Sequence, residues 1–244
     1  MTSHRPLRSW AITIAAALTV AAGLALGSWQ LSRAAQKNQL QAAITERKSL
    51  SALDGAALPA FGNGPGPTWR PVRLQGTWVV EHTVFLENRQ MRGRPGFDVL
   101  TPLRIEGTDS VVVVQRGWVQ RNFVDRSRLP QIETPAGRVE VNGRIAPPPP
   151  KLYQFGEAGS GVIRQNLDLG EFRTRTGLPL LTGLSVQQTG PASEGLLRDW
   201  AEPGSGVEKH YGYAFQWFAL SALIAVLYVW FQFIAPRRRS PDAR

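Results

Sequence analysis

A histidine with aromatic residues at helical spacing is the part of this sequence best suited to chemistry. His210 begins a stretch that continues, without Asp, Glu, Lys or Arg, from Tyr211 to Ile234. A helix rises about 1.5 Å per residue, so this stretch is long enough to cross a bilayer. Its spacing puts His210, Tyr213 or Ala214, and Trp217 on one face. An imidazole above such an aromatic ledge could hold a flat, partly apolar ligand.

The same residues have a second interpretation. Trp and Tyr form belts where membrane helices meet water, and His210 would then be a solvated neighbour of such a belt. The belt would consist of Tyr213, Trp217, Tyr228 and Trp230. This stretch alone does not decide between a ligand site and a belt.

Other kinds of active site have little support in the sequence. The chain has no cysteine and three histidines, His4, His82 and His210, which excludes thiolate nucleophiles, disulfides and cysteine-based metal sites. It also lacks a G-x-S-x-G turn and a P-loop ending in Lys-Ser/Thr. We interpret His82 as solvated, and Asp98 and Glu106 as surface carboxylates that balance arginines. The sequence therefore favours a non-enzymatic protein that binds or assembles.

The basic charge of the chain does not indicate a nucleic-acid partner. The 244 residues carry a formal net charge of +10. Half of it lies in residues 1–31 and 235–244, which hold six Arg and one Asp. Because the middle of the chain shows no basic stripe, we expect no nucleic-acid binding.

A second apolar run lies near the N-terminus, at residues 10–28. It is longer than the roughly 7–15 apolar residues of a secretory signal peptide, which favours a retained anchor over a cleaved one. Gly23 and Gly27 form a G-x-x-x-G pair, and such small faces let helices approach closely in lipid, although ordinary alanine content gives a similar pattern. The C-terminal apolar stretch also has small residues, namely Ser221, Ala222 and Ala225.

The basic flanks predict the topology. Arg5 and Arg8 precede the first apolar run, and Arg237 to Arg239 follow the second. Such flanks stay in the cytoplasm, whereas a long intervening loop is translocated largely regardless of its charge. We therefore expect a multi-pass protein of the cell inner membrane with both termini cytoplasmic and the middle domain periplasmic, as in a Gram-negative cell.

This topology brings two distant stretches to one membrane face. Trp29 and Gln30 leave the first helix where His210 and Trp217 enter the second, and Arg33 lies just beyond. We divide the chain into a cytoplasmic tail (1–9), a first transmembrane helix (10–31), an extracytoplasmic β-rich domain (32–209), a second transmembrane helix (210–234) and a basic cytoplasmic tail (235–244).

The middle domain is predicted to be mainly antiparallel β. A helical extension (32–53) and a Gly/Pro-rich loop (54–69) come first. Seven short β-branched or aromatic runs follow, at residues 72–80, 83–88, 97–105, 110–119, 139–145, 161–167 and 180–187. Val111 to Val114 predict a buried central strand, Asn142–Gly143 a tight hairpin or a bulge, and residues 168–176 a short helix. The fold class is a membrane protein of the α+β type, with two transmembrane helices flanking this domain.

Four stretches resemble a known family. They are Leu26–Gly27–Ser28–Trp29–Gln30–Leu31–Ser32–Arg33; Asn88–Arg89 with Gly96–Phe97–Asp98–Val99–Leu100–Thr101–Pro102–Leu103; Val113–Val114–Gln115–Arg116–Gly117–Trp118–Val119; and Glu208–Lys209–His210–Tyr211–Gly212–Tyr213–Ala214–Phe215–Gln216–Trp217–Phe218. Their order, the topology and the absence of cysteine closely resemble the surfeit locus protein one family of cytochrome c oxidase assembly factors. Gln115 and Gln120 depart from residues common in that family, and we expect no functional consequence.

The resemblance implies that this chain binds haem a and offers it to subunit one of cytochrome c oxidase. It assigns His210 as the axial ligand of the haem iron, and Trp29, Gln30, Tyr213, Gln216 and Trp217 as further residues of the haem site. Arg33 would lie near the haem propionates. Expected partners are oxidase subunit one, haem a synthase and the lipid bilayer. The alternative function is a structural chaperone or scaffold that holds subunit one without touching haem.

Overall fold

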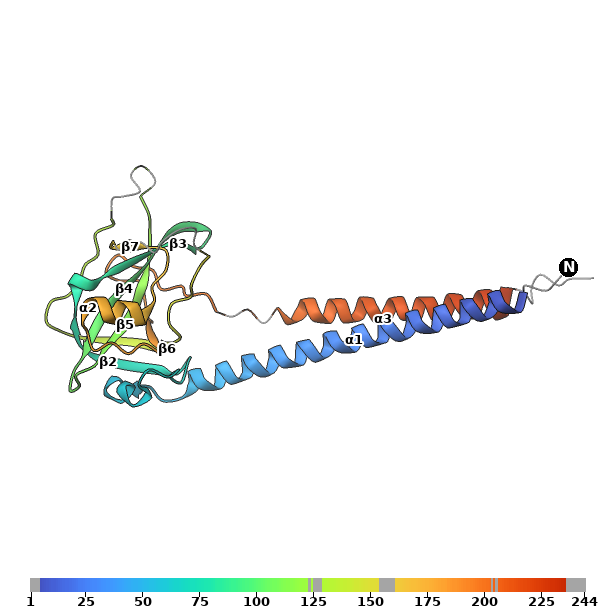
Figure 1. The fold of residues 1–244 in the computed structure, drawn as a ribbon, viewed down its shortest axis with the longest axis horizontal. Coiled ribbons are helices and arrows are strands. Elements are labelled where there is room, and N and C mark those ends of the chain that lie inside the picture. The colour runs from blue at the N-terminus through green and yellow to red at the C-terminus, as the bar shows by residue number, and fades with distance from the viewer. Residues whose placement is uncertain are drawn as a thin grey trace, which may run out of the picture. The chain divides into compact units, whose positions relative to one another are not determined.

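The chain folds into two compact units, one helical and one β-rich, which confirms the predicted α+β class (Figure 1). The computed structural model describes residues 5–122, 124, 129–153, 161–202, 204 and 206–235. The helical unit comprises the chain up to Ala43 and the segment after Glu202, and the β-rich unit runs from Ile44 to Glu202. Arg237 to Arg239, on which the predicted topology depends in part, lie outside the described residues.

Two long helices form the helical unit. Helix α1 runs without interruption from Arg5 to Ser49, and α3 runs from Val207 to Val229 and continues as a π-helical segment, η3, from Trp230 to Ile234. Both are long and apolar enough to cross a membrane. The expected boundary between residues 31 and 32 falls inside α1, because no proline interrupts the sequence between Pro6 and Pro59.

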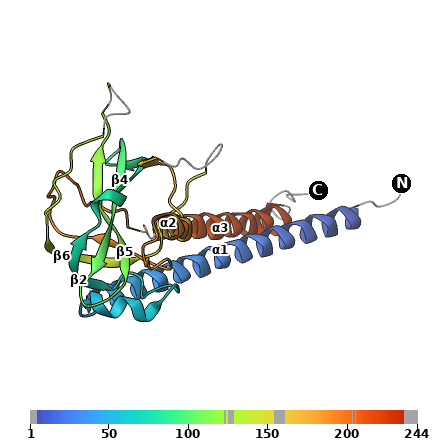
Figure 2. The same cartoon turned by 60° about the vertical axis from the view of Figure 1, so that its left-hand side comes forward.

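The two helices pack along a heptad seam. The less exposed residues of α1 recur at alternating spacings of four and three: Ser9, Thr13, Ala16, Val20, Gly23, Gly27, Gln30 and Ala34. Helix α3 shows the same rhythm at Val207, His210, Ala214, Trp217, Ser221, Ile224 and Tyr228. This repeat is typical of two helices that cross at a shallow angle in a left-handed pair. Both views show α1 and α3 side by side (Figure 1, Figure 2).

Glycines on α1 allow this close packing. A Cβ added to Gly23 would lie 2.1 Å from the Ser221 hydroxyl, and one added to Gly27 would lie 2.6 Å from the Phe218 ring. A side chain at either position would therefore force Ser221 or Phe218 of α3 to move. The prediction that the two small faces meet is therefore confirmed.

The β-rich unit is a closed sheet with short strands added at its edges. The elements are β1 (Leu53–Asp54), η1 (Gly55–Phe61), β2 (Pro71–Trp78), η2 (Val80–His82), β3 (Val84–Met91), β4 (Arg94–Ile105), β5 (Val111–Gln120), β6 (Arg138–Ala146), β7 (Ile163–Arg164), α2 (Leu169–Thr176) and β8 (Ser185–Gln188). The strand order is β1-β2-β6-β8-β5-β4-β3-β7, and a further pairing of β2 with β4 closes a five-stranded barrel. Most pairs are antiparallel, as predicted.

The strand β5 separates two hydrophobic clusters. Val112 and Val114 pack with β2 and β6 side chains, whereas Val111 and Val113 pack with Phe172 of α2. Successive side chains of a strand point to opposite faces, so a strand buried on both faces needs an unbroken apolar run. The predicted central strand is confirmed for this reason.

The tight hairpin and the bulge predicted as alternatives at Asn142–Gly143 are both wrong, because β6 continues through both residues and pairs with β2 and β8 in an unbroken register. Gly143 instead marks a close approach: an added Cβ would lie 2.6 Å from Val186 Cγ1 and 2.7 Å from the Gln187 carbonyl oxygen. The predicted strands at 161–167 and 180–187 shorten to β7 and β8, and the predicted short helix is α2, capped by Asp168.

Candidate functional site

The side chains of Gln30 and His210 meet across the helix pair. His210 Nδ1 lies 2.7 Å from Gln30 Oε1. A carboxamide oxygen only accepts hydrogen bonds, so in this contact the Nδ1–H group of His210 is the donor and Gln30 Oε1 the acceptor. In a neutral imidazole with this hydrogen bond, the lone pair is on Nε2, which is the electron pair that a metal ion binds.

Small residues on both helices bring these two side chains together. Gly27 and Ala34 flank Gln30 along the α1 seam, and Ala214 lies one turn after His210 on α3. Ala34 is fully buried and Ala214 is 2% exposed. Because these positions lack bulk, the helices approach until an amide and an imidazole span the gap directly.

Trp29 lies on another face of α1. Its side chain is half exposed, and the guanidinium carbon of Arg33 stands 5.7 Å from the centre of its ring. Arg33 also donates from Nη1 to Gln36 Oε1 at 3.0 Å. Trp29 and Arg33 thus form an aromatic and cationic pair one residue away from the seam that holds Gln30.

The aromatic residues after His210 divide between the seam and the exposed surface of α3. Trp217 is half-buried and shares the seam face with His210, while Tyr213 and Gln216 are exposed. Of the alternatives predicted for the face of His210, Ala214 occupies the seam and Tyr213 does not. Among the predicted site residues, the structure therefore joins His210 with Gln30, and groups Trp217 with them on one seam.

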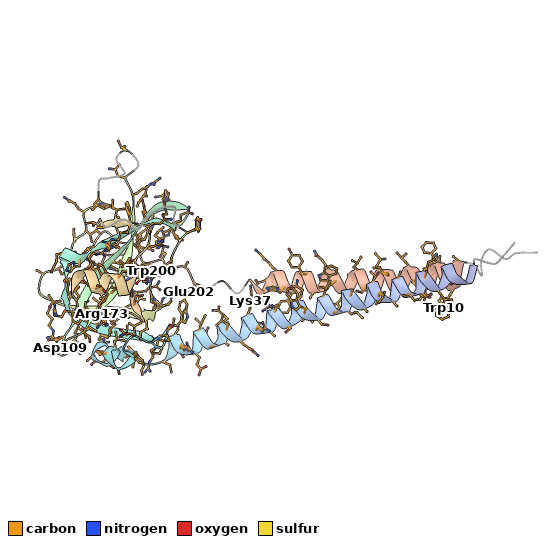
Figure 3. All side chains as sticks on the ribbon, viewed as in Figure 1. Trp10, Lys37, Asp109, Arg173, Trp200 and Glu202 are labelled. Atoms are coloured by element: carbon orange, nitrogen blue, oxygen red, sulfur yellow. The ribbon has the colours of Figure 1, made fainter. Side chains whose placement is uncertain are left out.

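Polar residues surround the start of α3. Asn38 Nδ2 donates to the Tyr211 hydroxyl at 3.2 Å. Lys37 Nζ lies 3.5 Å from where a Cβ on Gly206 would stand, next to the first turn of α3 (Figure 3). A cation here faces the positive end of a helix dipole, so this end of the helix pair is electropositive.

A second polar group lies at the other end of the seam and was not predicted. The hydroxyls of Thr13 and Tyr228 are 2.8 Å apart, and Gln232 Nε2 donates to the Ser9 hydroxyl. With Gln30–His210, these pairs show that the helices are antiparallel, since residue numbers rise on α1 as they fall on α3. The signal was the heptad spacing of Ser9, Thr13 and Gln30, which an analysis of apolar residues alone overlooks.

The β-rich unit holds the residues of the remaining motifs. Glu106 Oε2 pairs with Arg138 Nε at 2.7 Å, and Asp98 Oδ2 lies 3.8 Å from Arg89 Nε, so both carboxylates lie beside arginines as predicted. Glu106 is at the surface, but the prediction of a surface position is wrong for Asp98, whose side chain is only 20% exposed. His82 is not solvated as expected. It is half-buried, and the edge of its ring packs against Phe172 at 6.4 Å between centroids.

The Arg116–Gly117–Trp118 motif belongs to β5, and its residues pack against neighbouring segments of the β-rich unit. Arg116 is 1% exposed, donates to Glu194 Oε2 at 2.9 Å and stands over Trp78, while Trp118 Nε1 donates to the Arg89 carbonyl oxygen. Gly117 has φ 159° and leaves room for the Leu197 carbonyl oxygen, 2.7 Å from an added Cβ. The motif therefore holds the segment around Leu197 against the sheet.

Comparison with known proteins identifies the same stretches. The model of the SURF1 family matches residues 17–222, which is most of the chain and includes Gln30 and His210. A SURF1-like protein of Monosiga brevicollis is 25% identical over 226 residues, covering 84% of this chain and 81% of the relative. A SURF1-like protein of Rickettsia bellii is 26% identical over 212 residues, covering 83% of each chain.

Proposed function

The chain belongs to the SURF1 family of cytochrome oxidase assembly factors, and from that premise we propose that it binds haem a through His210 and offers it to oxidase subunit one. Haem a is cargo here, so the site must hold the iron firmly enough for transport and release it to the acceptor. A single histidine ligand leaves the sixth side of the iron open to exchange.

The Gln30–His210 hydrogen bond is the observation that carries this proposal. Histidines that bind metals donate their other ring N–H to an oxygen, which fixes the tautomer and makes the ligating nitrogen more basic. Gln30 Oε1 provides that acceptor at 2.7 Å. The bond leaves Nε2 available, which is the nitrogen through which a neutral imidazole in this tautomer coordinates haem iron.

The surroundings of His210 suit the rest of a haem. Trp29 and Trp217 offer indole rings to an apolar macrocycle, with Tyr213 and Gln216 exposed on the same turns of α3. Arg33 and Lys37 supply cations for the two propionates, because charge-assisted hydrogen bonds to carboxylates are strong. The residues present therefore fit each chemical part of the cargo: iron, ring and acid groups.

The proposed location follows from the two candidate spans. Both helices cross the cell inner membrane, with the termini in the cytoplasm and the β-rich unit in the periplasm. His210 then stands near the periplasmic surface of the bilayer. Oxidase subunit one receives the haem there, and haem a synthase supplies it.

Replacing His210 tests the haem site directly. We expect His210→Ala, purified from cells that make haem a, to lose most of its Soret absorbance while it remains folded and inserted. His82→Ala is the matched control, since His82 packs on Phe172 in the β-rich unit, and it should retain haem as wild type does. If His210→Ala held as much haem as wild type, the ligand assignment would fail.

A scaffold for subunit one is the second candidate function. Nearly all of the apolar surface of both helices is exposed, so each helix has room to contact partner helices as well as lipid. A scaffold would co-purify with subunit one and carry no Soret band. Stoichiometric haem in the purified protein would instead support delivery.

A further inference from the structure

A cavity of about 350 Å³ opens in the β-rich unit where three strands meet. Arg89 of β3, Asp98 of β4 and Gln115 of β5 line it, and all three belong to stretches of the family resemblance. Trp200 adds an aromatic wall (Figure 3). The helical unit contributes none of these residues, so this cavity is separate from the proposed haem site.

The Asp98 carboxylate lacks hydrogen-bond donors. Its side chain is 20% exposed, and within the described part of the chain it accepts no hydrogen bond. Arg89 Nε is 3.8 Å away, too far for a hydrogen bond, and is itself buried without a partner. The Arg89 Nη2 group is committed to the carbonyl oxygens of Pro150 and Gln165, at 3.0 and 3.2 Å. Arg89 therefore balances the charge of Asp98 without satisfying its oxygens.

Three other polar side chains of the cavity, Gln115, Gln187 and Asp199, have partners of their own. Gln187 Nε2 donates to Gln115 Oε1 at 3.1 Å, and Gln115 Nε2 donates to the Ser185 hydroxyl at 2.8 Å. Asp199, the second carboxylate on the cavity, pairs with Arg92. Of the two carboxylates on the cavity, Asp98 is thus the one that has no hydrogen-bonding partner among the described residues.

One other carboxylate and one other indole of the β-rich unit contact two cationic side chains each, which indicates the kind of ligand that fits beside Asp98. Glu194 Oε2 takes two guanidiniums, from Arg116 at 2.9 Å and Arg198 at 3.5 Å. The Trp69 ring takes two cations, Lys48 at 5.6 Å and Arg144 at 4.7 Å. Asp98 has one arginine, at 3.8 Å, and the Trp200 indole lines the same cavity. Both features attract a second cation, because a carboxylate forms charge-assisted hydrogen bonds with it and an aromatic face forms a cation–π interaction with it.

We propose that this cavity binds a guanidinium or ammonium group on an alkyl stem, the chemistry shared by a basic side chain and a small alkylguanidine. Asp98 accepts hydrogen bonds from the cationic group, and the stem lies among Met91, Pro150 and Trp200. The Trp200 indole is held in place because its Nε1 donates to the Gln188 carbonyl oxygen at 2.7 Å. The proposal does not depend on haem, so either site can fail without the other.

Calorimetric titration of the full chain in lipid nanodiscs tests the cavity. The probes are N-acetyl-Gly-Arg-Gly-amide, its neutral citrulline isostere and ethylguanidinium. We expect the arginine peptide to bind at least tenfold more tightly than the citrulline peptide. Asp98→Asn should weaken arginine binding at least tenfold, whereas Glu106→Gln, which neutralises a carboxylate paired with Arg138 at the surface, should leave it unchanged.

Acidity gives an independent readout that needs no variant. Burial raises the pKa of Asp98 to about 6, with Arg89 opposing the rise, and Arg92 and Asp199 are the other charged groups on the cavity. Arginine affinity should therefore fall as pH drops through 6, about tenfold by pH 5, because only the carboxylate binds the cation. Equal affinity for ethylguanidinium identifies a small-molecule source, and a clear preference for the peptide identifies a polypeptide. Equal binding of arginine and citrulline, or no binding by either guanidinium probe up to about 10 mM, would overturn the proposal.

Discussion

At the scale of single residues, the hydrogen-bond partner of a functional side chain decides which of its atoms can bind a ligand. His210 is a ligand candidate by type and spacing, but the Gln30 contact fixes which nitrogen is available. From the sequence we predicted that both residues lie at one membrane face, because the lengths of the apolar stretches and the basic residues beside them can be recognised in a single sequence. It did not pair them, because Gln30 and His210 are far apart in sequence and their contact depends on helix register.

The Gln30 acceptor is itself testable. We predict that Gln30→Leu lowers haem a affinity by about tenfold, because loss of the oxygen acceptor leaves Nδ1 and Nε2 to exchange protons. Gln30→Glu should retain affinity, since a carboxylate accepts the same hydrogen bond. Haem titration followed by Soret absorbance measures both variants. Gln36→Leu, which removes the partner of Arg33, is the control, and a loss equal to that of Gln30→Leu would show that Gln30 has no special role.

At the scale of elements, periodicity in the sequence predicted the regular strands and helices but not single close contacts such as that of Gly143. The main strands were found because alternating burial imposes a period of two, and the central strand because it is buried on both faces. Gly143 was misassigned because a glycine that permits close approach looks the same in sequence as one that permits a turn. Its meaning depends on Val186 and Gln187, which no local pattern connects to it.

Helix packing offers a prediction at this scale. Gly23→Leu should separate α1 from α3, because a side chain there would overlap Ser221. The chain has no cysteine, so Ser9→Cys and Gln232→Cys can be joined selectively by a short bifunctional thiol reagent. We expect Gly23→Leu to reduce that cross-link severalfold, and Ala22→Leu, at an exposed neighbouring position, to leave it intact. Unchanged cross-linking in Gly23→Leu would contradict the packed seam.

At the scale of the whole molecule, the sequence predicts the helical unit better than the β-rich unit. The helical unit was predictable because a bilayer demands long apolar segments with charged flanks. The cavity beside Asp98 was not, because its walls come from residues between Arg89 and Trp200 on several strands. Asp98 was interpreted as a surface carboxylate that balances an arginine; the arginine is there, but the side chain is mostly buried. Its missing hydrogen bonds become visible only once the sheet has closed around it.

The stability of the whole chain should record the state of Asp98. Its pKa rises from 3.8 to about 6 on folding, so the folded protein holds this proton more tightly than the unfolded chain. The resulting stabilisation is complete below pH 4 and is lost as pH rises through 6. Asp168 and Glu202, whose pKa values are lowered by Lys151 and Lys48, act in the opposite direction in wild type and variant alike. Comparing the pH profiles of wild type and Asp98→Asn therefore isolates Asp98.

We predict that, between pH 4 and pH 7.5, the free energy of unfolding of wild type falls by about 2 kcal/mol relative to Asp98→Asn. Urea unfolding at a series of pH values, followed by far-ultraviolet circular dichroism, measures this difference. Glu106→Gln should follow the wild-type profile. Parallel profiles for wild type and Asp98→Asn would mean that Asp98 titrates alike in both states. A measured fall would show that the folded protein is less stable when Asp98 is ionised near neutral pH. The ionised form is the one that the proposed cationic ligand would bind.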